Sequence, residues 1–147
     1  MKLFIYYSLT GNGDLVADYL KGKGYEIRKI EVKKPLPSNF VLQILTGGFK
    51  AAINYKEKLI DFNNDISKYD EIVIGSPIWN ARLSTPVSTA LKELDLTNKK
   101  TRFILYSGSG TSPKATEFIN KNYKDSKIID LKQPIANKKE LNKIEDI

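Results

Sequence analysis

Five short apolar runs, separated by segments with helical or loop character, constrain the fold of this 147-residue chain more than any other feature. The runs occupy residues 2–7, 25–30, 71–75, 102–106 and 127–131. Residues 71–75 are centred on the apolar run Ile72-Val73-Ile74, as in a buried strand, whereas residues 25–30 alternate and indicate an outer strand. Strands that alternate with helices form parallel sheets that are covered on both faces. We therefore predict an α/β fold with a doubly wound, five-stranded parallel sheet in a single domain spanning residues 1–147.

Helix signals fall between and after these runs. The first helix is expected near residues 13–22, directly after the first run. Further helix starts carry hydroxyl or amide caps, in two cases followed by proline: Ser38, Thr85-Pro86, Ser112-Pro113 and Asn137. Gly47 and Gly48 are expected to end the helix that Ser38 begins, because glycine commonly follows the last helical turn.

The composition excludes several kinds of chemistry. The chain has 0 Cys and 0 His, so it lacks a thiol nucleophile, a disulfide framework, the usual imidazole base and the commonest metal ligands. We expect no metal site, and any redox chemistry must come from a bound cofactor. No segment approaches the roughly 18 apolar residues of a membrane span. Since the first strand begins at once, we expect no signal peptide, no membrane partner and a cytoplasmic location.

The formal net charge of +7 allows more than one interpretation. Basic surfaces neutralise nucleic-acid phosphates, but these lysines are scattered and are not interleaved with aromatic residues. We therefore expect no nucleic-acid partner. A solvated lysine-rich surface, an acidic redox partner or a preference for anionic substrates remains open.

The loop after the first strand is a candidate phosphate site. Ser8, Thr10 and Asn12 carry hydrogen-bond donors, while Gly11 and Gly13 let the backbone approach a ligand closely. A row of backbone N–H groups at a helix N-terminus attracts an anion. No Lys or Arg is present in this loop, so dipoles and hydroxyls would hold the phosphate. The alternative is an ordinary strand-to-helix turn that Asn12 caps.

The loop after the third strand holds the only Trp of the chain, within Ser76, Pro77, Ile78, Trp79 and Asn80. A Trp above a sheet edge can stack on a flat ring. Alternatively, Trp79 folds back as a lid on the core. Asn80 tolerates positive φ better than other non-glycine residues.

The loop after the fourth strand contains Ser107, Gly108 and Ser109. Its backbone can run beside the polar edge of a ring and form hydrogen bonds to it. A flexible connector is the alternative interpretation. In open α/β sheets, ligands bind at the carboxyl ends of strands where the strand order reverses, so we expect all three loops to converge there.

These segments resemble a known family. Residues 7–12, 69–79 and 106–110 are similar to the ligand loops of short-chain flavodoxins and flavodoxin-like proteins, and residues 47–51 resemble a stretch in bacterial members. The resemblance extends over nearly the whole chain. It implies strand order 2-1-3-4-5 and bound FMN, with the phosphate on residues 8–13 and the ring between residues 76–81 and 107–111.

The chain departs from this family pattern at two places. Gly13 stands where the family usually has Thr or Ser, which removes one hydroxyl contact. Residues 107–112 lack the aromatic side chain that electron-carrier flavodoxins commonly stack on the flavin, and those carriers are typically acidic.

Three functions are consistent with the resemblance. The first is an NAD(P)H-dependent FMN oxidoreductase of the quinone reductase type, in which the uncovered side of the ring meets a small acceptor. The second is an electron carrier for a redox partner protein, in which a backbone carbonyl near Trp79 or Asn80 accepts a hydrogen bond from the flavin. The third is a flavin-free interaction module of the same fold. Neither redox function requires a catalytic acid or base from the protein.

Overall fold

The computed structural model describes all 147 residues. Five parallel strands form the sheet in the order β2-β1-β3-β5-β6: β2 is Glu26–Lys29, β1 is Lys2–Tyr6, β3 is Glu71–Trp79, β5 is Lys100–Ser107 and β6 is Lys127–Lys132. A two-residue strand, β4 (Arg82–Leu83), pairs antiparallel with the end of β3. Because β4 lies off the main path, this order is the predicted 2-1-3-4-5 arrangement.

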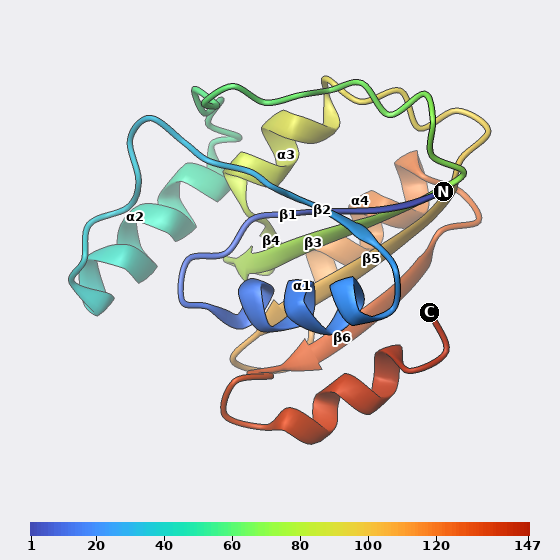
Figure 1. Cartoon of the computed structure of the whole chain (residues 1–147). Helices are drawn as coiled ribbons and strands as arrows, with labels where there is room; N and C mark the ends of the chain where they lie inside the picture. Colours follow the sequence, from blue (N-terminus) through green and yellow to red (C-terminus); the bar gives the residue numbers. More distant parts are fainter.

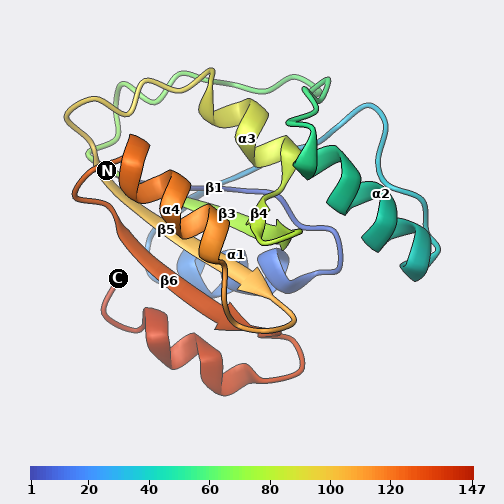
Figure 2. The ribbon, with the colours of Figure 1, turned by 180° about the vertical axis from the view of Figure 1, so that it is seen from behind.

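Alternating residues of β1 separate two hydrophobic layers. Leu3 and Ile5 belong to the layer beneath α2 (Phe40–Ala52), α3 (Thr85–Leu91) and α4 (Pro113–Asn122). Phe4 and Tyr6 point to the opposite layer, beneath α1 (Asn12–Gly22) and the 3₁₀ helix η1 (Lys138–Ile144). Figures 1 and 2 show these helices on the two faces of the sheet, with α2 displaced to one side. This period of two is what buries both faces of a parallel strand.

The sheet and its crossover helices confirm the predicted architecture, but several boundaries were wrong. The second helix begins after Asn39, whose side chain accepts hydrogen bonds from two backbone N–H groups, and not after Ser38. It continues through Gly47 and Gly48 to Ala52. Gly47 serves packing, since a Cβ there would lie 3.1 Å from Leu36 and 3.2 Å from Trp79.

One other helix start differs from the prediction, whereas the terminal helix begins after Asn137 as predicted but differs in type. Ser84, not Thr85, is the N-cap of α3, so Thr85 is the first helical residue. The terminal helix is 3₁₀, and the Asn137 side chain forms no capping hydrogen bond. No helix of the structure has the length and apolar character required to cross a bilayer.

The β3–β4 hairpin was not predicted, because β3 runs four residues farther than the apolar run that identified it. Asn80 and Ala81 form its turn, with φ of 50° and 61°. Positive φ at both central residues is typical of the tight turns that join antiparallel strands. The positive φ of Asn80 agrees with the tolerance of Asn for this conformation that the sequence indicated.

Candidate functional site

A cavity of about 650 Å³ opens at the carboxyl ends of β1, β3 and β5. All three predicted loops reach it: the predicted site residues Thr10, Asn12, Pro77, Ile78, Trp79, Asn80, Ser107 and Gly108 line its wall. The predicted convergence of these loops therefore occurs. The volume lies within the range of small-molecule and cofactor pockets.

The first loop presents backbone donors at the start of α1. The Ser8 hydroxyl accepts hydrogen bonds from the N–H groups of Gly11 and Gly13, at 3.2 Å and 3.1 Å. The N–H groups of Thr10 and Asn12 have no hydrogen-bond partner in the chain, and both residues line the cavity. Ser8, Gly11 and Gly13 lie behind this surface and shape the loop. Unpaired N–H groups at a helix N-terminus favour an anion.

Two neighbouring tyrosine side chains leave room only for glycine at position 13. A Cβ at this position would lie 2.9 Å from Cζ of Tyr106 and 2.9 Å from Cδ2 of Tyr6, and closer still to the Tyr106 hydroxyl. That hydroxyl is buried and donates a hydrogen bond to the carbonyl of Tyr7. Burial raises the pKa of Tyr106 well above its ordinary value, so the phenol stays protonated. Tyr106 thus occupies the space that a Thr or Ser side chain at position 13 would need.

The one carboxylate near the loop is already paired. The Tyr6 hydroxyl donates to Asp14 at 2.8 Å, and the Lys29 ammonium lies 2.7 Å from the same oxygen. Partial burial raises the pKa of Asp14, but the hydrogen bonds from Lys29 and Tyr6 and the charge of Lys29 outweigh it and lower the pKa overall. The Asp14 charge is therefore largely neutralised before a phosphate approaches.

Trp79 lies at the edge of the cavity and is also part of the core. Its indole is 9% exposed, meets the ring of Tyr7 edge-on at a centroid distance of 5.9 Å, and lies against Gly47 of α2. Both interpretations of Trp79 from the sequence therefore describe part of its environment. The residue lines the cavity as a fixed wall and does not project as a free platform.

Two predicted serines are occupied elsewhere. The Ser76 side chain is buried, with its hydroxyl 2.8 Å from the carbonyl of Pro77 and 3.1 Å from the Ser84 hydroxyl. Ser109 lies outside the cavity wall, where its hydroxyl contacts Thr111. Neither hydroxyl faces the cavity.

Two segments of the wall were not predicted from the sequence. The pocket-facing side of α2 and the segment after β6 contribute residues that no loop motif indicated: Phe40, Gln43, Ile44, Gly48, Gln133, Ile135 and Ala136. The Asn12 side chain accepts a hydrogen bond from the Ile135 N–H at 3.0 Å, which joins the first loop to the segment after β6. The family-like stretch at residues 47–51 was the only signal that α2 contributes to the site.

The wall of this cavity contains no charged side chain. It combines apolar and aromatic residues with amide and hydroxyl groups, which suits an uncharged flat ring with polar edges. A phosphate on the same ligand would meet backbone N–H groups of the first loop. These features fit FMN, which carries a neutral ring system and a single phosphate.

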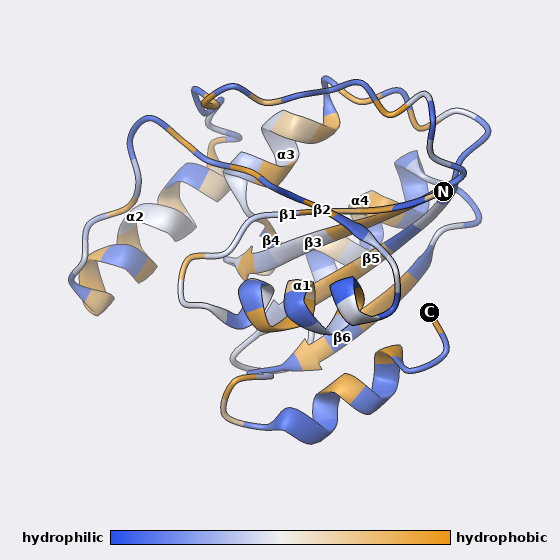
Figure 3. Cartoon of the chain, viewed as in Figure 1, coloured by the Kyte–Doolittle hydropathy of each residue, from blue (hydrophilic) through white to orange (hydrophobic).

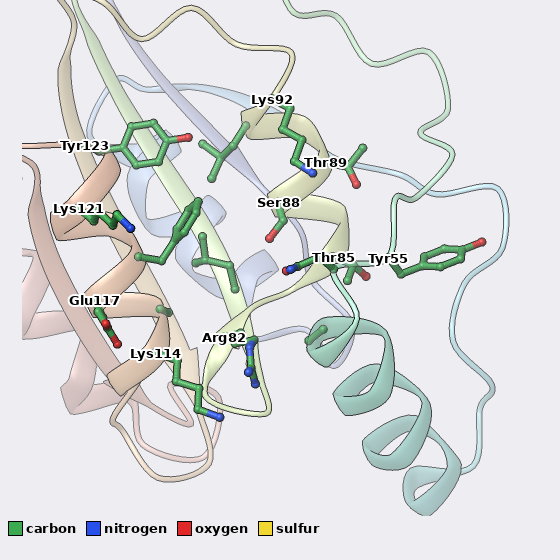
Figure 4. Close-up of a pocket in the computed structure, with 16 residues that line it drawn as sticks. Tyr55, Arg82, Thr85, Ser88, Thr89, Lys92, Lys114, Glu117, Lys121 and Tyr123 are labelled. Atoms are coloured by element: carbon green, nitrogen blue, oxygen red, sulfur yellow. The ribbon is translucent and has the colours of Figure 1, made fainter.

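A second cavity, of about 620 Å³, lies between α3 and α4 (Figure 4). Its wall carries four basic side chains and one carboxylate: Arg82, Lys92, Lys114, Lys121 and Glu117. It does not include the start of α1 or the loop after β5. The two cavities therefore differ in charge, and the predicted loops line the neutral cavity.

Flavoproteins are among the solved structures that share this architecture. A protein assigned as a flavoprotein from Bacteroides eggerthii matches with a TM-score of 0.75 and 19% identity, over 96% of this chain and 95% of that one. A flavoprotein from Lactobacillus acidophilus, solved in complex with FMN, matches at 0.68 and 18%, over 94% and 96% of the two chains. An oxidised flavodoxin from Bacillus cereus matches at 0.51 and 14%, over 99% and 98%.

No family model and no curated protein matches this chain. At identities below 20%, the structural matches establish the fold. The chain has the flavodoxin-like fold that its sequence motifs predicted.

Proposed function

We propose that this protein binds FMN in the neutral cavity and transfers electrons through it. The observation that carries the proposal is the convergence of three loops and the N-terminus of α1 around a cavity without charged side chains. The FMN complex of the Lactobacillus acidophilus flavoprotein, which shares the fold, supports the same cofactor. When bound, FMN supplies the redox chemistry, because its ring accepts and releases electrons.

The residues of the chain would bind and orient the cofactor. The N–H groups of Thr10 and Asn12 would hold the phosphate, aided by the dipole of α1. Trp79 would form one apolar wall for the ring. The backbone of Ser107 and Gly108 would meet its polar edge. Ser8 and Gly13 act indirectly, because they set the shape of the loop.

A small-molecule reductase is the favoured form of this function. Trp79 is recessed into the core and residues 107–111 bring no aromatic ring to the cavity, so one side of the flavin would remain accessible to a small acceptor such as a quinone. A carrier role would instead require docking of a redox partner protein, for which the net charge of +7 favours an acidic one.

Anaerobic reduction of the FMN-loaded protein separates the two forms. We expect direct two-electron bleaching of the flavin by dithionite, and NAD(P)H-dependent turnover with a small quinone. A long-lived one-electron-reduced flavin without NAD(P)H turnover would instead establish the carrier. A protein that takes up no FMN would overturn both forms.

A further inference from the structure

Helix α2 exposes its large side chains and buries its small ones. Gly47 and Ala51 face the core, whereas Leu45 and Phe49 are 64% and 65% exposed, and Leu42 is half exposed. Apolar residues also mark the end of α2 that lies farthest from the sheet (Figure 3). A surface helix normally shows the opposite pattern, with its large apolar residues toward the core. The outer face of α2 is therefore suited to being covered.

The spacing of this outer face matches that of a helix pairing with another helix. Leu42, Leu45, Phe49 and Ala52 follow intervals of three, four and three residues, which place them on one seam. The seam contains no charged residue. The only Lys of the helix, Lys50, turns toward the buried Glu57 at 3.1 Å. We call these four residues the outer seam.

The exposed area is large enough for a specific contact. The outer seam and its neighbours Val41 and Ile53 expose on the order of 550 Å² of apolar surface, at the upper end of what a monomer normally shows. Two such faces that covered each other completely would bury at most about 1,100 Å², close to the threshold of about 1,000 Å² for a specific interface.

We propose that a second copy of this chain covers the outer seam, so that two α2 helices pack against each other across a two-fold axis. A second copy supplies an identical uncharged seam of equal length. The lysine of α2 is already paired with Glu57, so the outer seam itself presents no free cation to a membrane surface or an acidic partner.

The cavity and the outer seam use different sides of the helix. Phe40, Gln43 and Ile44 line the cavity, whereas Leu45 and Phe49 do not. Substitutions at Leu45 and Phe49 therefore leave the proposed FMN contacts in place, and FMN binding by such variants reports that they are folded.

Sedimentation velocity at 1–100 µM protein tests the proposal. We expect a dimer whose association strengthens as salt rises, because screening reduces the repulsion between two chains of charge +7. The double variants Leu45→Lys/Phe49→Lys and Leu45→Glu/Phe49→Glu should each be monomeric, and an equimolar mixture of the two should form a heterodimer. Ile60→Lys, at an exposed apolar site outside α2, should remain dimeric.

Three results would overturn the proposal. The first is a wild-type monomer at 100 µM at every salt concentration, including one that co-sediments with vesicles of anionic phospholipid. The second is a dimer that both double variants retain. The third is a mixture of the oppositely charged variants that stays monomeric while each variant still binds FMN.

Discussion

Replacing Gly13 by Ala should destabilise the protein, although alanine is the better helix former. The new Cβ would overlap the Tyr106 ring and lie 2.9 Å from the Tyr6 ring. Overpacking of this kind costs about 1–3 kcal/mol. Displacing Tyr106 would also weaken its buried hydrogen bond to Tyr7, at a further cost of about 1–3 kcal/mol. The higher helix propensity of Ala offsets at most about 1 kcal/mol of this loss in stability. With each cost taken at the middle of its range, we expect a net loss of about 3 kcal/mol.

Urea denaturation without flavin, followed by Trp79 fluorescence, measures this loss free of ligand effects. In a separate thermal unfolding experiment, the melting temperature of the variant should fall by about 6–10 °C relative to wild type for a chain of this size. Gly22→Ala is the matched control, because it lies on the same helix and its Cβ would have no atom within 4 Å. That variant should be slightly more stable than wild type. A Gly13→Ala protein as stable as wild type would refute the assigned role of Tyr106.

Other predictions test the candidate site, the ion pair of Glu71 in the sheet and the ion pair that joins α2 to α3. Trp79→Ala should weaken FMN binding by about 1–3 kcal/mol in calorimetric titration, and an unchanged affinity would remove Trp79 from the site. Burial raises the pKa of Glu71, but the hydrogen bond from Tyr25 and the charge of Arg102 outweigh the effect of burial, so the pKa is lowered overall. The ionised carboxylate therefore stabilises the fold above about pH 4.5, and this stabilisation is lost as the pH falls further. Glu71→Gln should therefore be less stable than wild type at pH 7, and the difference in chemical denaturation should shrink as the pH falls below about 4.5 and through the lowered pKa of Glu71. Glu57→Ala leaves Lys50 unpaired between α2 and α3 and should cost about 3 kcal/mol of unfolding free energy, whereas a loss under 1 kcal/mol would contradict a structural ion pair.

The five parallel strands were predictable because each carries its own apolar signal, whereas their order in the sheet was predicted from the resemblance to flavodoxins. The tight turn at Asn80 was predictable only in part. Asn favours positive φ, but Ala81 does not, and nothing in its local sequence indicates a hairpin. The helix end at Gly47 was mispredicted for a related reason. Position 47 holds glycine because it packs against Trp79, 32 residues away in the chain, and not because a helix ends at this position.

The candidate site was predictable where a loop follows a strand, because parallel strands bring their carboxyl ends to one edge. It was not predictable where the fold adds a wall from elsewhere. Ile44 reaches the cavity from α2 and Ile135 from the segment after β6, and both look like ordinary apolar residues in the sequence. The reason for Gly13 is equally non-local, since this residue of α1 is constrained by the side chain of Tyr106 on β5.

A comparison of FMN with riboflavin tests the central claim most directly, since riboflavin lacks only the phosphate. Titration of flavin-free protein should show one FMN site per chain and quenching of Trp79 fluorescence. Two charge-assisted hydrogen bonds from the first loop, at about 1.5 kcal/mol each, predict that FMN binds on the order of 100-fold more tightly than riboflavin. Equal affinity for the two flavins, or no binding of either at 100 µM, would contradict a flavin phosphate at the start of α1.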